Sequence, residues 1–445
     1  MKLFFKGFGA AMVGASAVMA VVFLLPSLAS RLDKTGVLAF LASVDAPVAE
    51  QRKTKEELVA EAMEKSSGIK ALYMTADVAN DPGAGAVGLR KNIIRLAEET
   101  EINGIVIDVK EVCGPDYHEQ ALKKLLRELR EKNIWAIARV AAFKDASQRE
   151  AHPEWYLTRA ASKKVSDWCL RKRRLTARGS ALQESGKILW QDDKGGYWLD
   201  PASDGAREYL ASFAKKIIDL GFDELQFDYI RFPSDGDVAA AQYPVYDGKT
   251  LKYGVMKSFF EYLSKELKTY KSDIILSADL FGYVAVQGGD DTIGQRLADI
   301  GGSFDYVSFM VYPSHYYNGV QFPADPVRDF AAVNFSFAEA RAHPDITVGR
   351  SLQIAYDFLN PAPASSTVAV AGSPPLSSSR ARLRPWLEDF FHEADRVAAR
   401  PWGATKVRLE IDAAEKVEDH GWMLWNASNV YTEDALKKDA TGADK

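Results

Sequence analysis

The chain has 445 residues, of which 47% are hydrophobic and 26% charged, and its formal net charge at pH 7 is −5. These values are ordinary for a globular protein, and such an acidic chain is not expected to bind nucleic acid. The six histidines show no metal-ligand spacing, and the sequence contains no Gly-x-Ser-x-Gly elbow or phosphate loop. We therefore expect no metal and no other cofactor.

The N-terminus has the pattern of a segment that directs export. Lys2 and Lys6 precede a nearly uncharged run from Phe8 to Leu28, as in a signal peptide with a cleavage site near Ala29. The run is also long enough to span a bilayer as a retained anchor. We predict a signal peptide or membrane anchor over residues 1–30. The remainder is then periplasmic or extracellular, or held at the membrane by the N-terminal helix.

The rest of the chain divides into three parts. Residues 31–68 are mixed in composition and include a charged, helical pattern from Gln51, which we interpret as a linker or stalk. Strand and helix patterns then alternate over residues 69–435, as in a parallel sheet wrapped by helices. Residues 436–445 form a C-terminal tail.

Eight strands are predicted within residues 69–435. They lie in residues 71–77, 104–110, 134–143, 221–233, 274–282, 306–313, 383–390 and 421–426. Eight strands with intervening helices predict a single (β/α)₈ TIM barrel. A doubly wound open sheet is the main alternative, but the sequence lacks its Gly-rich nucleotide turn.

Two segments interrupt the repeat and predict insertions after the third and sixth strands. Residues 158–197 contain the basic run 171–174, which is typical of a solvated face; gripping an anionic polymer is a less favoured role. Residues 360–380 are rich in Pro, Ala and Ser, which predicts a flexible insertion.

The sequence leaves open whether the two cysteines form a disulfide. Cys113 and Cys169 could pair in an oxidising compartment, although two cysteines do not make a disulfide framework. Cys113 follows a strand end and Cys169 lies in the basic insertion, and we favour the unpaired state.

The fourth strand places a carboxylate where a catalytic group is expected. Leu225 and Phe227 point to one face, and Gln226 and Asp228 point to the other. In a TIM barrel the C-terminal ends of the strands carry the active site. The structural alternative is an Asp228 paired with Arg231 or with a cation on a neighbouring strand.

Charged residues recur near the other strand ends and predict one cavity ringed by several acids. They are Asp108, Arg139, Asp279, Glu388 and Asp389. Glycoside hydrolysis uses two carboxyl groups whose surroundings separate their pKa values. Asp228 and Asp279 lie on consecutive strands, so we expect them to form this pair.

Aromatic residues predict a surface for sugar rings. Tyr312 and Trp386 share the inward register of Asp228 and are the better stacking candidates, whereas Trp425 is expected to be half core and half cleft. His315 follows the sixth strand and could line the cleft, but a loop histidine with no role is an equal alternative.

The order of motifs resembles a known family. The sequence GFDELQFDYIRFP at 221–233 and SADLFG at 277–282 are the clearest; the others lie at 104–110, 137–145, 153–155, 198–201, 306–316, 384–390 and 421–429. Together they resemble a family of bacterial exported proteins, once a domain of unknown function, assigned to the TIM-barrel glycosidase superfamily. The resemblance implies active-site carboxylates at Asp228 and Asp279. It also implies that Asp108, Arg139, Arg231 and Asp389 surround them. Position 388 departs from the family pattern, which usually has Gln.

The resulting hypothesis is a glycoside hydrolase that acts on a cell-envelope or extracellular polysaccharide. Asp228 acts as nucleophile or base and Asp279 as general acid, with Arg139 and Arg231 orienting carboxylates or substrate. The alternative is a non-catalytic barrel that binds carbohydrate or organises the envelope; a lyase or deacetylase is a weaker third. Convergence of the two acids in one open cleft favours catalysis, whereas acids each locked to an arginine favour binding.

Overall fold

The computed structural model describes residues 53–160, 169, 188–361, 381–418 and 420–438. Five predicted features lie wholly or partly outside these ranges: the segment 1–30, residues 31–52 of the stalk 31–68, the basic run 171–174, residues 362–380 of the Pro-rich stretch 360–380, and residues 439–445 of the tail 436–445. Residues from Lys55 onward form one compact unit. Among the described helices, none combines the length and the apolarity needed to cross a membrane.

The eight predicted strands form a closed parallel barrel. In chain order they are β1 (Ile69–Met74), β2 (Gly104–Glu111), β4 (Trp135–Ala141), β7 (Glu224–Asp228), β8 (Ile275–Phe281), β11 (Tyr306–Met310), β15 (Trp386–Glu388) and β16 (Gly421–Trp425). Each pairs with the next in parallel, and β1 also pairs with β16, so the sheet closes. The predicted TIM barrel is confirmed.

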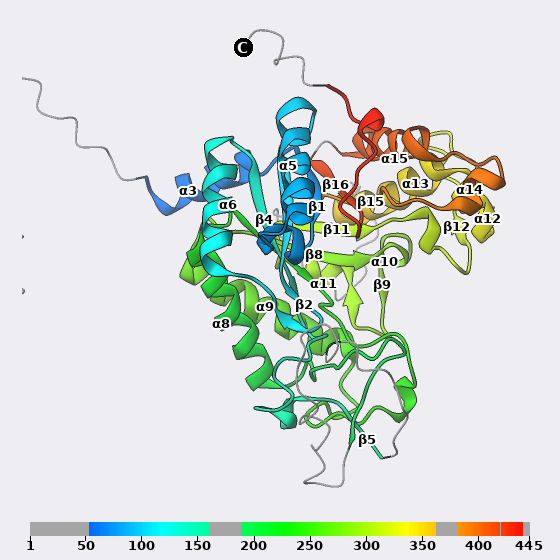
Figure 1. Ribbon diagram of the computed structural model, residues 1–445. Helices are drawn as coiled ribbons and strands as arrows, with labels where there is room; N and C mark the ends of the chain where they lie inside the picture. The colour runs from blue at the N-terminus through cyan, green and yellow to red at the C-terminus, as the bar shows by residue number, and fades with distance from the viewer. Residues whose placement is uncertain (1–52, 161–168, 170–187, 362–380, 419, 439–445) are drawn as a thin grey trace, which may run out of the picture. The chain divides into compact units, whose positions relative to one another are not determined.

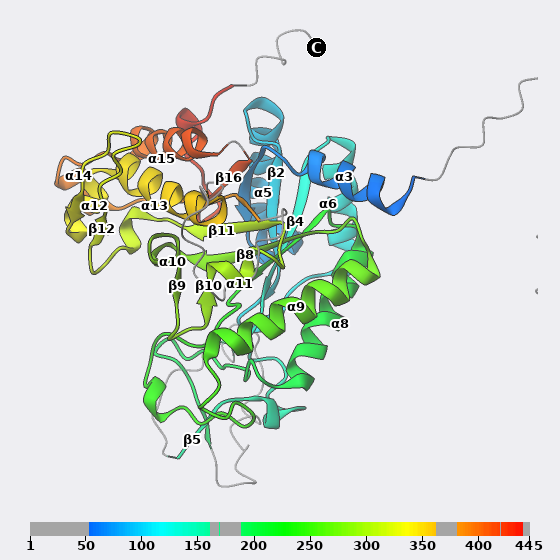
Figure 2. The ribbon, with the colours of Figure 1, turned by 180° about the vertical axis from the view of Figure 1, so that it is seen from behind.

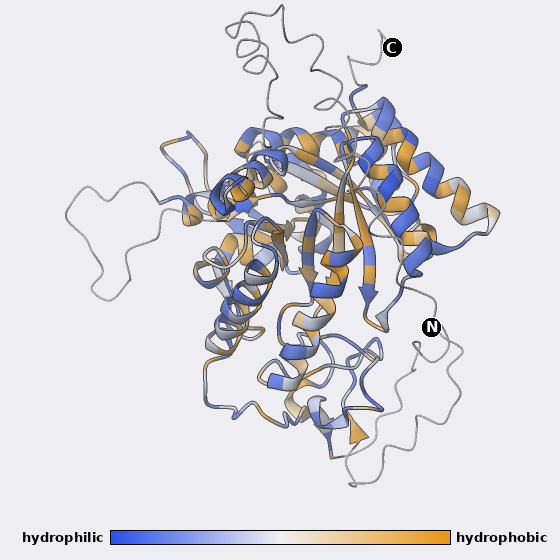
Figure 3. Ribbon diagram, turned by 90° about the vertical axis from the view of Figure 1, so that its left-hand side faces the viewer, coloured by the Kyte–Doolittle hydropathy of each residue, from blue (hydrophilic) through white to orange (hydrophobic). Residues whose placement is uncertain are grey.

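Helices surround this barrel (Figures 1 and 2). The longer ones are α5 (Ala84–Glu99), α6 (Glu119–Glu131), α8 (Asp204–Leu220), α9 (Lys252–Tyr270), α13 (Pro344–Leu359) and α15 (Gly403–Val417). They carry both hydrophobic and hydrophilic residues (Figure 3), and α6 buries Leu122, Leu125, Leu126 and Leu129 at helical spacing. The shorter helices are α3 (Lys55–Lys65), α4 (Ala76–Asn80), α10 (Gly282–Gln287), α11 (Leu297–Ile300), α12 (Phe337–Ala342) and α14 (Glu393–Val397).

Side-chain alternation separates two apolar regions. Residues on the outer face of the strands, such as Leu225 and Phe227, pack with the helices in the main core. The inner face forms a smaller cluster that fills the barrel, consisting of Ile69, Ala71, Tyr73, Val106, Ile137, Tyr312, Trp386 and Met423. Polar inner-face groups are therefore held among apolar neighbours, in register from strand to strand.

Several strands end earlier than predicted, and two of the differences have a local cause. β7 ends at Asp228 rather than at Pro233, because Tyr229 adopts a left-handed backbone with φ 50°. The predicted seventh strand is divided into β14 (Arg382–Leu383) and β15, since Pro385 has no N–H to donate to a sheet. Each of these differences lies beside a polar side chain of the strand.

The segments after β4 and β7 pack together beyond the C-terminal ends of the strands. The first contains β5 (Thr158–Arg159) and β6 (Ile188–Leu189). Thr158 bridges Gln242 in the second, and the Asp200 carboxylate accepts the backbone N–H groups of Val245 and Tyr246 at 2.8 and 2.9 Å. In Figures 1 and 2 the β5 region lies at the end of the molecule that α8 and α9 approach. Further short strands are β3 (Gly114–Pro115), β9 (Gly289–Asp290), β10 (Gln295–Arg296), β12 (Val320–Phe322) and β13 (Val333–Phe335).

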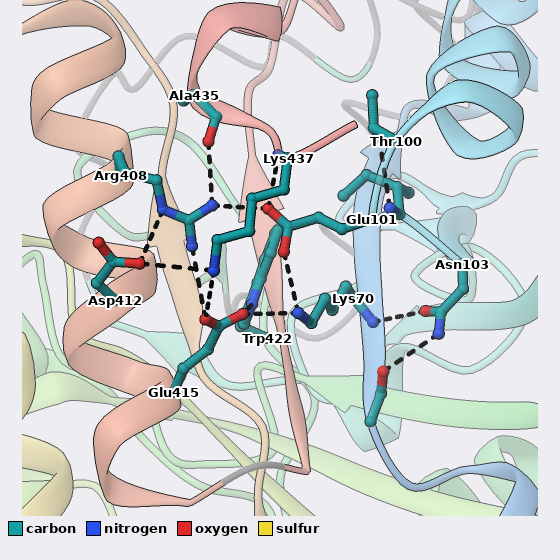
Figure 4. Close-up of polar contacts among 12 residues, drawn as sticks. Lys70, Thr100, Glu101, Asn103, Arg408, Asp412, Glu415, Trp422, Ala435 and Lys437 are labelled. Atoms are coloured by element: carbon teal, nitrogen blue, oxygen red, sulfur yellow. Dashed lines mark hydrogen bonds and ion pairs between the residues drawn. The ribbon is translucent and has the colours of Figure 1, made fainter. Parts of the chain in front are cut away.

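A network of charges joins the first strand to the last helix (Figure 4). Lys70 on β1 pairs with Glu101 at 3.0 Å and with Glu415 on α15 at 2.7 Å. Arg408 also pairs with Glu101, at 2.6 Å, and the Lys437 backbone N–H donates to the same carboxylate at 2.9 Å. These contacts tie the chain beyond β16 to the point where the barrel closes.

The two cysteines are joined by a disulfide. Cys113, just after β2, is bonded to Cys169 in the segment between β4 and α8, and both are buried. The unpaired state favoured from the sequence is therefore wrong, because chain order gave no sign that these two segments meet over Ala146. The bond attaches the long segment between β4 and α8 to the loop that follows β2, the strand that carries Asp108.

Reduction of this disulfide is expected to destabilise the fold. The cysteines are 56 residues apart, and closing a loop of that length in the unfolded chain corresponds to about 4 kcal/mol. We expect Cys113→Ser, or treatment with dithiothreitol, to lower the free energy of unfolding by about 2–4 kcal/mol, in line with that estimate. Urea unfolding followed by tryptophan fluorescence measures it. Equal stability with and without reductant would show that the bond contributes nothing.

Candidate active site

One arginine organises the charged groups at the C-terminal end of the barrel. Arg139 projects inward from β4, and its Nη1 lies 2.6 Å from Asp108 Oδ1 on β2. Its Nη2 pairs with Asp228 Oδ2 on β7, and its Nε lies 3.7 Å from Asp279 Oδ2 on β8. The predicted convergence of carboxylates therefore centres on a single guanidinium, shared by three strands.

The two proposed catalytic acids differ in their surroundings. The Asp228 side chain is 10% exposed, and its Oδ1 accepts the backbone N–H of Tyr229 at 2.5 Å. The Asp279 side chain is 1% exposed, and its Oδ1 accepts the indole N–H of Trp386 at 2.8 Å. Asp228 thus reaches solvent next to Arg139, while Asp279 lies deeper on the neighbouring strand.

The electrostatics of the site favour different protonation states for its members. Burial, reinforced by the charge of Asp228, raises the pKa of Asp279 well above its usual range, despite the nearby Arg139. Burial opposes the charge on Arg139, but the carboxylates of Asp108 and Asp228 outweigh it and raise the pKa of the guanidinium. A protonated Asp279 can thus stand beside a permanently charged Arg139.

Tyr73 belongs to this site although the sequence analysis did not single it out. Its hydroxyl donates to Asp108 Oδ2, and burial and the charge of Asp108 raise the pKa of the phenol. Arg139 and Tyr73 together hold Asp108 from both sides. The inward register of Ala71 and Tyr73 on β1 is the signal that would have identified it.

Aromatic residues form a wall beside the carboxylates. Tyr312 is buried, and its ring centroid lies 6.2 Å from that of Trp425 and 5.8 Å from that of Phe390. His315 is exposed, 5.1 Å from the Tyr312 ring. Trp386 is also buried and directs its indole N–H to Asp279, so it orients this carboxyl group.

Glu388 and Asp389 face a different space from the carboxylates around Arg139. Both line a cavity of about 460 Å³ between the ends of β15 and β16 and helix α15, together with His392, Asp395, Lys406 and Asn426. Asp389 accepts from the Thr432 hydroxyl at 2.5 Å, and burial raises its pKa to about 6. Phe390 lines this cavity and also packs against Trp425, with the ring centroids 5.3 Å apart.

Glu388 is the centre of a buried ion network. Its Oε1 pairs with Lys406 on α15, and its Oε2 accepts from the Ser314 hydroxyl at 2.5 Å. Lys406 Nζ also lies 3.9 Å from Glu410 Oε1 and 4.0 Å from Asp395 Oδ2. Burial lowers the pKa of Lys406 to about 8, against the charge of Glu410. The network fastens α15 to the strand end.

We expect Glu388→Gln to act mainly on stability, because it leaves Lys406 buried without its direct partner. The free energy of unfolding should fall by about 3 kcal/mol, measured by urea denaturation at pH 7. The double variant Glu388→Gln with Lys406→Gln, which removes both charges, should recover part of this loss. Lost turnover at unchanged stability would instead identify Glu388 as a substrate-binding residue.

Arg231 does not pair with Asp228. Of the two structural partners that the sequence allowed for Asp228, the cation on the neighbouring strand, Arg139, is the one present. Arg231 is buried three residues beyond Asp228, and its Nη1 donates to its neighbour's carbonyl, Phe232 O, at 2.9 Å.

Within the described ranges, no three His, Cys, Asp or Glu side chains are grouped so that they could hold a metal ion.

Solved structures similar to this one include carbohydrate-active enzymes. A hypothetical protein from Ruminiclostridium thermocellum is 26% identical over 47% of this chain and 96% of its own, with a TM-score of 0.34. An α-galactosidase from Thermus thermophilus is 12% identical over 85% of this chain and 64% of its own, with a TM-score of 0.44. An α-amylase from Geobacillus thermoleovorans is 12% identical over 84% of this chain and 75% of its own, with a TM-score of 0.43.

The family assignment comes from the sequence itself. No curated protein matches the chain. Residues 71–431, which include every strand of the barrel except the first two residues of β1, match the family described as "Putative glycosyl hydrolase domain". This match agrees with the resemblance found from the motifs. The chain belongs to the family of the putative glycosyl hydrolase domain.

Proposed function

We propose that the protein hydrolyses glycosidic bonds of a cell-envelope or extracellular polysaccharide, with Asp228 as nucleophile or base and Asp279 as general acid. The observation that carries the proposal is the placement of these two carboxyl groups on adjacent strands around Arg139, together with the burial that raises the pKa of Asp279. Glycoside hydrolysis requires such a pair.

The chemistry divides between the two acids as follows. Asp279, kept protonated by burial, gives its proton to the oxygen of the leaving sugar. Asp228, paired with Arg139, attacks the anomeric carbon or removes a proton from the attacking water. Arg139 also compensates the change in charge as Asp279 loses its proton. Trp386 and Tyr73 keep the side chains of Asp279 and Asp108 in place.

We also propose that the protein is exported, either released after cleavage or held to the membrane by its N-terminal segment. The disulfide between Cys113 and Cys169 supports this location, because disulfides persist in oxidising compartments and are rare in the cytosol. Export would place the barrel next to envelope and extracellular glycans.

A screen for cleavage tests the proposed reaction. The purified chain is incubated with a panel of envelope glycans and exopolysaccharides, and new reducing ends are measured, with Asp228→Asn as the inactive control. Release of reducing ends by the wild type alone supports hydrolysis. Products carrying a new double bond would indicate a lyase instead.

A specific observation also favours a second candidate, a barrel that binds carbohydrate without cleaving it. Arg139 pairs with Asp108 as well as with Asp228, and a carboxylate held by an arginine is a weaker nucleophile. Binding of a glycan by wild type and by Asp228→Asn with similar affinity, and no product after prolonged incubation, would support this candidate over the hydrolase.

A further inference from the structure

Arg231 is a buried cation enclosed by aromatic rings. The side chain is 5% exposed, and its guanidinium carbon lies 4.5 Å from the ring centroid of Phe281, 5.0 Å from that of Trp198 and 5.5 Å from that of Tyr229. One of its five N–H groups is accounted for by the bond to Phe232 O. No carboxylate in the part of the chain that the structure describes forms an ion pair with it.

A second cation shares two of these rings. Lys144 Nζ lies 5.1 Å from the centroid of Tyr229 and 5.9 Å from that of Trp198. Lys144 is paired with Asp192 at 2.7 Å, and the same carboxylate accepts the Trp198 indole N–H at 2.9 Å. Of the two cations around these rings, Lys144 is therefore balanced and Arg231 is not.

The nearby acids do not supply the missing partner. Asp228, Asp235 and Asp192 act on Arg231 electrostatically, but Asp228 is bonded to Arg139, Asp192 to Lys144, and Asp235 accepts the backbone N–H of Asp193 at 3.4 Å. A buried charge is normally paired and hydrogen-bonded, because removing it from water is costly. Three aromatic rings offset part of this cost through cation–π attraction. Among the described residues, the only hydrogen-bond acceptor of the guanidinium is the Phe232 carbonyl, so the rings leave its other N–H groups without an acceptor.

The position of Arg231 connects it to the proposed chemistry. It follows Asp228, the last residue of β7, by three residues, and Phe281, which packs against it, follows Asp279 by two. The guanidinium is thus close to Asp228 along the chain and packs against the ring that follows Asp279. A substituent on a sugar bound at Asp228 is the ligand group best placed to meet it.

We propose that Arg231 binds a carboxylate of the substrate, so that the protein acts on an acidic polysaccharide containing uronic acid units. This inference rests on the proposed function, since it assigns the substrate class of the same site. A guanidinium presents parallel N–H donors that match the two oxygens of a carboxylate. The unbalanced charge and the unused donors are both satisfied by such a group.

Binding to carboxylated polymers and to their neutral counterparts tests the inference. The probes are alginate, hyaluronan and pectate, each also in carboxyl-reduced form, and dextran sulfate as a polymer with a different anion. Affinity electrophoresis and calorimetry are carried out on the wild-type chain. We expect at least one carboxylated polymer to bind about ten- to a hundredfold more tightly than its reduced form.

Substitution at Arg231 should remove this preference. Arg231→Gln is expected to bind the carboxylated and reduced forms alike, and Arg231→Lys to keep part of the difference because it keeps the charge. Arg296→Gln is the matched control, since Arg296 also stacks on a ring, Tyr253 at 3.8 Å, but is already paired with Asp299 at 2.6 Å. Thermal unfolding of each variant establishes that it is folded.

Three outcomes would overturn the inference. They are no binding of any carboxylated probe, equal binding of each polymer and its reduced form by the wild type, and a preference for dextran sulfate that depends on Arg231. The result is separable from that for the proposed function. Cleavage of a neutral glycan that requires Asp228 would refute the acidic substrate alone, and Arg231-dependent binding without cleavage would refute hydrolysis alone.

Discussion

Asp228→Asn is expected to abolish glycan cleavage while leaving the protein folded. The change removes the charge that attacks or activates water, and losses at such positions are about a thousandfold or more. Stability should change little, because Arg139 keeps its contact with Asp108 at 2.6 Å. The measurement is turnover on the most active glycan of the panel, together with the melting temperature of the variant.

A carboxylate in the segment that follows β7 supplies the control for this prediction. Asp237 is exposed and its backbone carbonyl, rather than its side chain, accepts the Trp190 indole N–H at 2.8 Å. Asp237→Asn should therefore retain wild-type turnover. If Asp228→Asn cleaves the glycan at the wild-type rate, the assignment of the active site to this cluster is wrong.

Asp279→Asn is expected to reduce turnover in a way that depends on the leaving group. A general acid contributes about 10²- to 10⁴-fold when the leaving oxygen needs a proton. The loss should be of that size on a polysaccharide. It should be much smaller on an aryl glycoside of the same sugar, whose phenolate leaves without protonation. Equal losses on both substrates would exclude Asp279 as the acid.

The pH profile provides a second test of the same residue. Asp279 must be protonated to act as an acid, and burial together with the charge of Asp228 raises its pKa. Wild-type turnover should therefore fall as the pH rises through this raised pKa. Trp386→Phe removes the N–H that stabilises the ionised form, so it should move this decline to higher pH. If neither Trp386→Phe nor Asp279→Asn changes the decline of turnover with pH, that decline belongs to another group.

The raised pKa also has a predictable effect on stability. Because folding raises the pKa of Asp279, the folded state binds its proton more tightly than the unfolded chain does. Between the two pKa values stability must then fall as the pH increases. Asp279→Asn cannot ionise, so this part of the pH dependence should be absent from its unfolding curve. This readout is independent of activity and of the substrate.

The local sequence pattern was sufficient for the barrel and for the neighbourhood of the two acids. All eight strands lie where alternation and helical spacing predicted them, because each strand must bury one face against helices and the other in the barrel. Consecutive parallel strands are neighbours in such a fold. Because β7 and β8 are consecutive, Asp228 was expected beside Asp279 from the sequence alone.

The partners of these acids could not be found in the same way. That Arg139 would bind Asp108 and Asp228 together, and that Tyr73 would complete the site, depends on the diameter of the barrel and on side-chain length. Glu388 and Asp389 lie at a strand end as predicted. They turn to Lys406 and Thr432 instead, because Pro385 divides the strand and α15 brings a buried cation to it.

The sequence by itself thus determined which fold forms and which two carboxyl groups lie side by side, because both follow from period and chain order. Only the tertiary structure decided which cation each acid meets, that Cys113 reaches Cys169, and that Arg231 forms no ion pair with a carboxylate among the described residues. These are contacts between segments far apart in the chain. They depend on how loops and helices of particular lengths pack around the barrel, which no local pattern encodes.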